Sequence, residues 1–121
     1  MSSKDTESGI YAIRGEALSG VAFFQDYVEF HFDGKVVRSL TAPTLALPNG
    51  KGYTFPEAGS RDALCSLIGF VVENVLVKEN QHIELVFSGG YTARIPLEIS
   101  ERTGPEAAHY VPGLNQPIDV W

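Results

Sequence analysis

Two pairs of residues combine an imidazole with a carboxylate two positions apart: Glu29 with His31, and His82 with Glu84. Residues two apart on a strand point to the same face, so each pair can offer two ligands to one metal ion. If the two strands lie side by side, the pairs converge into a ligand set suited to zinc or iron. Alternatively, both pairs lie on the solvated face of an antiparallel sheet, where His and Glu are common.

The sequence contains no diagnostic metal-ligand spacing, so we predict neither a metal nor another cofactor. Five residues remain as candidate ligand-binding positions: Tyr27, Glu29, His31, His82 and Glu84. The sequence has no G-x-S-x-G elbow, P-loop or Rossmann glycine pattern. It therefore identifies no catalytic residue and leaves open whether the protein is an enzyme.

Cys65 is the only cysteine. A nucleophilic thiol needs a base within hydrogen-bond reach and a lowered pKa, whereas Cys65 falls mid-way along an expected helix, beside its apolar face. A lone cysteine in that position is typically a small buried hydrophobe, and that is our prediction; a reactive thiol is the alternative. Because Cys65 has no cysteine to pair with, a reducing, cytoplasmic setting is the simplest expectation.

Two further polar residues attract attention. We expect His109 to be a surface histidine in a loop, or else a general acid or base if the C-terminal segment folds over a cleft. Arg61 is expected to reach a carboxylate at the end of a sheet, although nothing in the sequence identifies that partner.

The elements that must position these residues are strands. In segment 27–32 alternate apolar residues share one face, as in a half-buried strand. Asp33-Gly34 is a tight-turn signal, after which segment 35–40 returns as the partner strand. Segment 21–24 forms an earlier strand, so the first half predicts a three-stranded meander.

The second half follows the same scheme, with strands expected over 70–77, 82–87 and 91–95. Between the halves, segments 44–47 and 53–55 flank a Pro-Asn-Gly turn and predict an extra hairpin.

The two halves also share a motif. Leu18-x-Gly20 followed by Phe32-x-Gly34 recurs as Leu67-x-Gly69 followed by Phe87-x-Gly89. We predict a two-copy repeat of three-stranded meanders that pack face to face or close into a barrel, because neither copy can bury its apolar face alone. The alternative is that any two antiparallel hairpins look alike.

One short helix is expected over residues 60–68, between the two copies. Ser60 is a suitable N-cap and Gly69 a suitable C-cap. Three apolar residues fall on one face at helical spacing: Leu64, Leu67 and Ile68.

At the ends of the chain the pattern fades. Residues 1–9 are polar and predict a disordered leader, and residues 10–121 form a single β-rich domain. Residues 101–121 read as an extended tail in which segment 106–111 makes a helical turn. The terminal Trp121 is expected to pack on its own domain or to dock into a neighbour.

The composition limits the possible partners. A chain of 121 residues with net charge −6 and a pI of about 4.9 does not carry the basic footprint that nucleic acid or an anionic membrane requires. No apolar run reaches the roughly 18 residues of a membrane-spanning helix. The acidity is compatible with a basic protein partner.

The repeated motif resembles small uncharacterised bacterial β-rich proteins, some of which look like immunity proteins of toxin–antitoxin-type loci. The resemblance covers residues 16–100 and consists mainly of turn and core positions. The tail, with Gly104-Pro105 and Trp121, departs from the acidic-aromatic ending expected of that group, and no functional residue is carried over.

The expected fold is therefore mainly β, an antiparallel sandwich or partly open barrel with one short helix. We expect a non-enzymatic bacterial binding module, an immunity-like partner of another protein, and a homodimer because sheet edges need covering. The alternative is a β-barrel protein that binds a small ligand or a metal through the five candidate residues. An enzyme is one version of this alternative.

Overall fold

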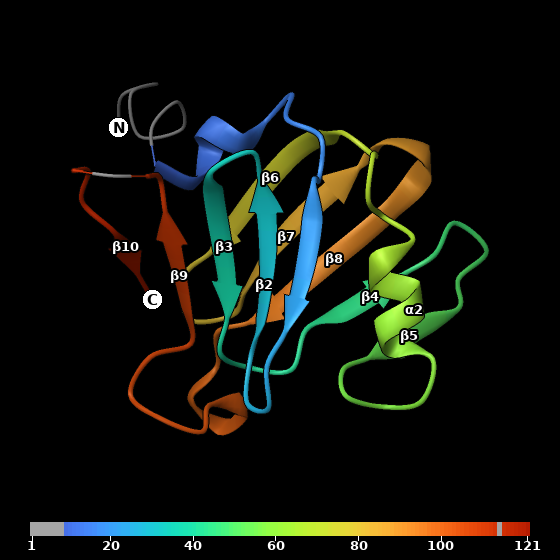
Figure 1. Cartoon of the computed structure of the whole chain (residues 1–121). Coiled ribbons are helices and arrows are strands. Elements are labelled where there is room, and N and C mark those ends of the chain that lie inside the picture. Colours follow the sequence, from blue (N-terminus) through green and yellow to red (C-terminus); the bar gives the residue numbers. More distant parts are fainter. Residues whose placement is uncertain (1–8, 114) are drawn as a thin grey trace.

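The computed structural model describes residues 9–113 and 115–121 and arranges ten strands in two antiparallel sheets of five (Figure 1). The first sheet contains, in spatial order, β1 (Gly20–Phe23), β2 (Val28–Phe32), β3 (Lys35–Ser39), β9 (Ala108–Val111) and β10 (Asp119–Val120). The second contains β5 (Gly52–Thr54), β4 (Thr44–Ala46), β8 (Tyr91–Pro96), β7 (His82–Phe87) and β6 (Val72–Lys78). The helical elements are η1 (Gly9–Ile13), α2 (Ser60–Cys65), η2 (Ser88–Gly90) and η3 (Ile99–Glu101).

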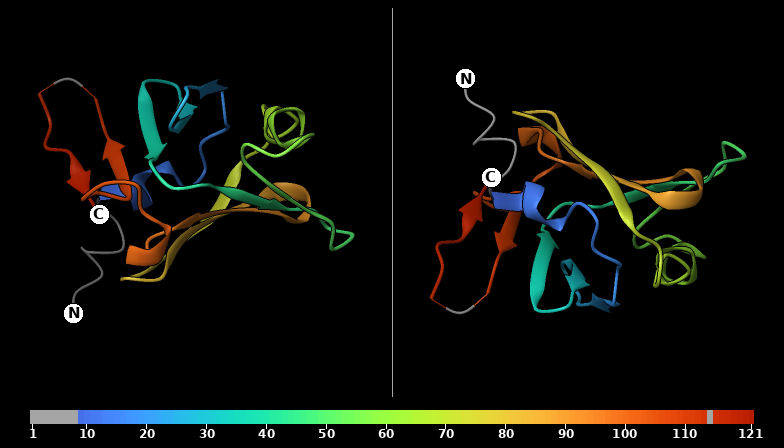
Figure 2. Two further views of the ribbon diagram at one scale, coloured as in Figure 1. Left: turned by 90° about the horizontal axis from the view of Figure 1, so that it is seen from below. Right: turned by 90° about the horizontal axis from the view of Figure 1, so that it is seen from above.

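The two sheets form separate layers that face each other (Figure 2). The predicted mainly β fold is confirmed, and of its two forms the sandwich is the one observed. Both expected meanders are present, since β1, β2 and β3 are consecutive neighbours in one sheet and β6, β7 and β8 in the other. That the two meanders are copies of one repeat stays a prediction.

The β2–β3 hairpin follows directly from its turn. Asp33 and Gly34 have φ values of 48° and 95°, the left-handed conformation that a two-residue type I′ turn requires at both positions. Such a turn places Phe32 opposite Lys35 and therefore Glu29 opposite Arg38. The pairing of Glu29 with Arg38 is thus set by a local signal, the two-residue turn.

The core consists of the alternate residues of both inner faces. The rings of Phe32 and Phe87, which occupy matching positions in the two meanders, stack across the sandwich with centroids 6.5 Å apart. Burial of such apolar surface is the main source of stability. The largest fully buried side chains are Tyr110, Phe30, Phe32, Phe87, Ile10, Ile13, Leu18, Leu45, Leu64, Leu67, Ile83 and Leu85.

The predicted helix is present but shorter than expected. It ends at Cys65, and Leu64 and Leu67 are buried while Ile68 is 46% exposed. The chain turns at Gly69, whose φ is 96° and whose N–H donates to the carbonyl of Leu18. This turn directs Ile68 outward, so the prediction that it belongs to the buried face was wrong.

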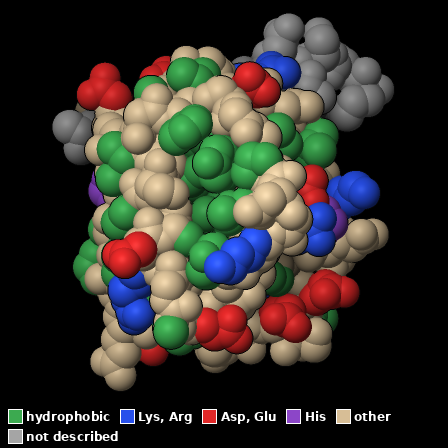
Figure 3. All heavy atoms as spheres, turned by 90° about the vertical axis from the view of Figure 1, so that its right-hand side faces the viewer, with side chains coloured by type: hydrophobic (Ala, Val, Ile, Leu, Met, Phe, Trp, Pro, Cys, Tyr) green, Lys and Arg blue, Asp and Glu red, His purple; other side chains and the backbone are tan. Residues whose placement is uncertain are grey.

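The predicted N-cap was also wrong. Gly59, in the left-handed conformation, precedes the helix, and Ser60 is its first residue. The hydroxyl of Ser60 is buried and has no hydrogen-bond partner among the described residues. The helix contacts β1, β4 and β5 and thereby covers one open end of the sandwich (Figure 2). Hydrophobic side chains gather in the middle of the molecular face seen from this side (Figure 3).

The C-terminal segment is not an appended tail. Segment 106–111, predicted as a helical turn, instead supplies β9, which pairs with β3 on one side and β10 on the other. The physical reason is the open edge of β3, together with the alternation of buried Ala108 and Tyr110 with half-buried His109. Trp121 packs against the core of its own domain, and its N–H donates to the carbonyl of Ala108.

The predicted leader, residues 1–9, lies outside the described residues except for Gly9, which begins η1.

Candidate functional site

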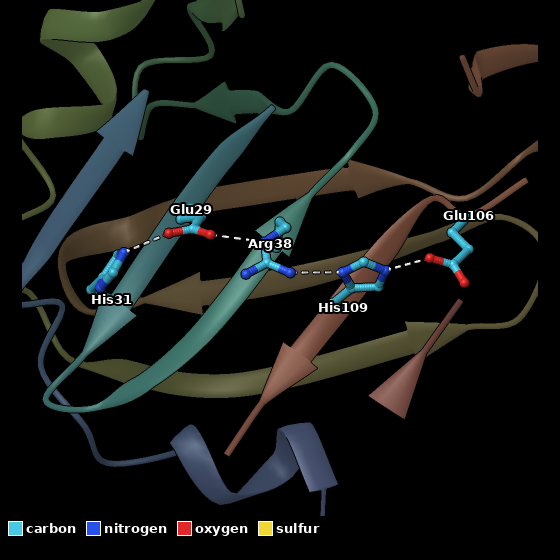
Figure 4. Close-up of polar contacts among 5 residues, drawn as sticks. All are labelled: Glu29, His31, Arg38, Glu106 and His109. Carbon is cyan, nitrogen blue, oxygen red and sulfur yellow. Dashed lines mark hydrogen bonds and ion pairs between the residues drawn. The ribbon is translucent and has the colours of Figure 1, made fainter. Parts of the chain in front are cut away.

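A row of five polar side chains crosses the outer face of the first sheet. We call it the polar ladder, and its members are Glu29, His31, Arg38, Glu106 and His109 (Figure 4). Register places Arg38 opposite both Glu29 on β2 and His109 on β9. The strand neighbours of Glu29, His31, Arg38 and His109 point into the core, so these four side chains must point outward, while Glu106 precedes β9.

The ladder is continuous from end to end. His31 lies beside Glu29, with Nε2 3.0 Å from Oε1, and Nε of Arg38 donates to Glu29 Oε2 at 2.8 Å. Nη1 of Arg38 lies 3.0 Å from Nδ1 of His109, and Nε2 of that ring lies 2.6 Å from Glu106 Oε1. Each side chain therefore holds its neighbour in place, so the geometry of the row is preorganised.

Arg38 decides the proton position on His109. A guanidinium can only donate, so Nδ1 of His109 must accept and carry a lone pair. The proton of this neutral ring then sits on Nε2, where it is donated to the Glu106 carboxylate.

Glu29 is the most enclosed member, with a side chain 13% exposed. Burial alone would raise the pKa of its carboxyl, but hydrogen bonds from Arg38 and His31, with the charges of those groups, hold the pKa below its ordinary value. Glu29 is therefore the carboxylate on which the ladder is centred.

Aromatic and apolar groups border the ladder. Tyr27 lies under the guanidinium of Arg38, with 5.8 Å from Cζ to the ring centroid, and stacks on exposed Phe24 at 4.4 Å. Beyond His109, the exposed Val120 of β10 occupies the next position along the same row. The ladder is thus an ionic centre between two apolar margins.

A shallow hollow lies at the His31 end. It is lined by Ser19, Gly20, Val21, Ala22 and His31. Gly20 is directly opposite His31 in the β1–β2 pair, and a Cβ added there would meet no atom within 4 Å. The missing side chain of Gly20 therefore leaves room beside the imidazole.

The second predicted pair lies elsewhere. Glu84 accepts from Nε of Arg94 at 2.9 Å, and Nε2 of His82 lies 3.4 Å from its Oε2, all on the outer face of the second sheet. Ile83 and Leu85, between them, are buried, so this pair and the Glu29–His31 pair face away from each other across the sandwich.

The convergence of the two pairs on one metal ion is therefore overturned. In the part of the chain that the structure describes, no three His, Cys, Asp or Glu side chains lie close enough together to hold a metal.

Cys65 and Arg61 differ from expectation. Cys65 is exposed, so its predicted burial was wrong; its side chain reaches solvent although the preceding residue, Leu64, is buried. Among the described residues, no carboxylate forms an ion pair with Arg61. Its guanidinium lies over two stacked rings, with Cζ 5.0 Å from the Phe55 centroid and 5.9 Å from that of Phe23.

Two members of the ladder were missed by sequence reasoning. Arg38 was recoverable, because the Asp33-Gly34 turn alone sets it opposite Glu29. Glu106 was not, since it depends on β9 joining β3, and for the same reason His109 was placed in a loop.

No protein-family model, curated protein or solved structure matches this chain. The resemblance to immunity-type proteins accordingly stays a prediction. Among the described residues, no helix is long and apolar enough to cross a membrane.

Proposed function

We propose that the protein is a non-enzymatic binding module that docks another protein on the outer face of its first sheet. The observation that carries the proposal is the polar ladder, which joins three strands in one connected set of ion pairs and hydrogen bonds. A surface held in this way is preorganised for recognition.

The chemistry of the surrounding face supports the same proposal. Arg and Tyr are enriched among residues that dominate binding energy, and Arg38 at the centre of the ladder stacks on Tyr27 at its border. Exposed Phe24 and Val120 provide apolar area on either side. The hollow beside Gly20 offers a place for one partner side chain.

The partner that best fits is a basic protein. The chain carries a net charge of −6, so long-range attraction would favour a positively charged partner. An immunity-like role in a bacterium, with this module bound to a basic protein in the cytoplasm, is the specific form of the proposal. The cytoplasmic setting is supported by the exposed thiol of Cys65, which an oxidising compartment would modify.

The test is site-specific crosslinking in cells. A photoreactive residue at Val36, on the outer face between His31 and Val111, is expected to capture a partner. The same residue at Thr92, on the outer face of the second sheet, is the matched control. Capture at Thr92 but not at Val36 would contradict the proposal.

Binding of the captured partner is then measured with surface variants. Gly20→Val partly fills the hollow, where an added Cβ meets nothing within 4 Å, and Arg38→Ala removes the centre of the ladder. Each should weaken binding by about 2 kcal/mol, the loss typical of an interface hot spot. Gly104→Val, at an equally open glycine, should leave binding unchanged.

A further inference from the structure

Strand β6 is the longest of the four strands that end a sheet. It has seven residues, against four in β1, three in β5 and two in β10. An edge strand presents unpaired main-chain groups that can accept another strand. β6 therefore presents the longest edge to which another strand could be added.

The outward-facing groups of β6 can be identified. The main-chain groups of Val72 point away from β7. Its N–H donates to the carbonyl of Glu16 at 2.9 Å, and its carbonyl accepts from the N–H of Gly15 at 2.8 Å. Outward and inward groups alternate along a strand, and the bulge between Val72 and Asn74 shifts this alternation by one. The main-chain groups of Val75 and Val77 therefore face away from β7.

These groups are largely unused. Among the described residues, one hydrogen bond involves the outer main-chain groups of this stretch. The N–H of Val75 donates to the side-chain oxygen of Asn74 at 2.9 Å. A groove follows the same edge, lined by Asn74, Val75, Leu76, Val77 and Lys78 along β6 and by Tyr11 and Arg14 opposite. Leu76 is 40% exposed there.

We propose that β6 pairs with β6 of a second copy of this chain, antiparallel, with the two-fold axis at Leu76. In this register Val75 of each copy lies opposite Val77 of the other. These residues carry the outward main-chain groups, so the two copies exchange four N–H···O=C bonds once the N–H of each Val75 leaves the side-chain oxygen of Asn74 for the facing carbonyl. Leu76 meets its own equivalent in a non-hydrogen-bonded pair, where side chains are closest.

Charge complementarity supports a second copy as the occupant. Glu73 and Asn74 are the two residues at the bulge, and both are exposed. The register places Lys78 of the second copy opposite Asn74, within reach of Glu73 beside it. By symmetry this contact between opposite charges occurs twice, once at each end of the paired stretch.

The resulting dimer has one continuous sheet of ten strands and leaves the polar ladder exposed on both copies. It thus goes beyond the proposed function and does not depend on it. An interface of one strand pair is small, so the dimer should be concentration-dependent. The homodimer expected from the sequence thereby acquires a specific interface.

The first test is sedimentation equilibrium over a wide concentration range. The wild-type protein should dimerise reversibly. Leu76→Glu places two carboxylates opposite each other and should weaken dimerisation at least about tenfold, whereas Ile99→Glu, a matched change at a residue 83% exposed on η3, should not. A dimer that Leu76→Glu leaves intact overturns the proposal, and so does a strict monomer whose Leu76→Cys variant fails to crosslink in the disulfide test below.

The second test swaps the charges. Glu73→Lys and Lys78→Glu should each weaken the dimer, and the double variant should restore it, because the two ion pairs are re-formed with opposite sense. Loss of dimer in the double variant overturns the register.

A third test detects a dimer that is too weak to be populated in the sedimentation experiment. In a Cys65→Ser background, Leu76→Cys should form a disulfide between two copies on mild oxidation, since directly opposed residues of a non-hydrogen-bonded pair lie within disulfide reach. Thr92→Cys in the same background is the control and should remain monomeric. Equal crosslinking of both variants counts against the interface.

Discussion

Nη1 of Arg38 lies 3.0 Å from Nδ1 of His109, although the two residues are 71 positions apart in the sequence. The contact joins β3 to β9 on the outer face of the first sheet (Figure 4). It makes Arg38 a bridge between the Glu29 carboxylate on one side and the His109–Glu106 pair on the other.

This contact predicts the tautomer of His109. The neutral ring should carry its proton on Nε2 and none on Nδ1, because Arg38 can only donate. Long-range ¹H–¹⁵N correlation spectra at neutral to alkaline pH report the two nitrogens separately. In Arg38→Gln, whose amide can donate or accept, the strict preference should weaken; a wild-type ring protonated on Nδ1 would contradict the contact.

Acid stability should depend on Glu29. Its pKa is lower in the folded protein than in the unfolded chain, so its contribution to stability is present above the unfolded-state pKa of about 4.3 and is lost as pH falls through the folded-state value. The difference in free energy of unfolding between wild type and Glu29→Gln should therefore be largest near neutral pH and shrink below about pH 4. Urea denaturation at a series of pH values measures it.

The companion variant is Arg38→Gln. Because Arg38 is the principal group that lowers the Glu29 pKa, its loss should reduce the same pH-dependent contribution. The free energies of unfolding of wild type and Glu29→Gln could instead differ by the same amount at every pH. That result would show that the ladder does not stabilise the ionised carboxylate of Glu29.

Arg61 should stabilise the closed end of the sandwich through its two rings. Arg61→Ala is expected to lower the free energy of unfolding by about 0.5–1 kcal/mol, the range for an exposed cation–π contact. Arg61→Lys should retain part of this because the charge remains. Asp62→Ala, at the next residue of α2, makes no such contact and serves as the control in the same chemical denaturation series.

Cys65 should react with a thiol reagent in the native protein nearly as fast as in the denatured protein, because its side chain is exposed. The matched control is Leu64→Cys in a Cys65→Ser background, since Leu64 is 1% exposed and a thiol there should be protected. Slow native labelling of Cys65, released by denaturant, would favour the buried position that the sequence suggested.

The sequence was most informative where the determinants are local. Alternation in segment 27–32 and the Asp33-Gly34 turn together specify β2, β3 and their register, and hence that Glu29 and Arg38 share a face. The helix showed the limit of such reasoning. Spacing placed Ile68 with Leu64 and Leu67, but the turn at Gly69 bonds to Leu18 and directs Ile68 to solvent.

The C-terminal segment shows what local signals do not contain. Segment 106–111 is short, and its pattern of polar and apolar residues does not predict a strand. It forms one because β3 offers an open edge. That non-local pairing moves His109 from an expected loop into the centre of the polar ladder.

The amino-acid sequence by itself determined the strands of the two meanders and which of their side chains leave the core, because period-two alternation and turn conformation act over a few neighbouring residues. Only the tertiary structure decided which outward residues of separate hairpins meet. The two His–Glu pairs lie on opposite sheets because each meander buries its apolar face against the other. Arg38 meets His109 because two strands distant in the chain share one edge.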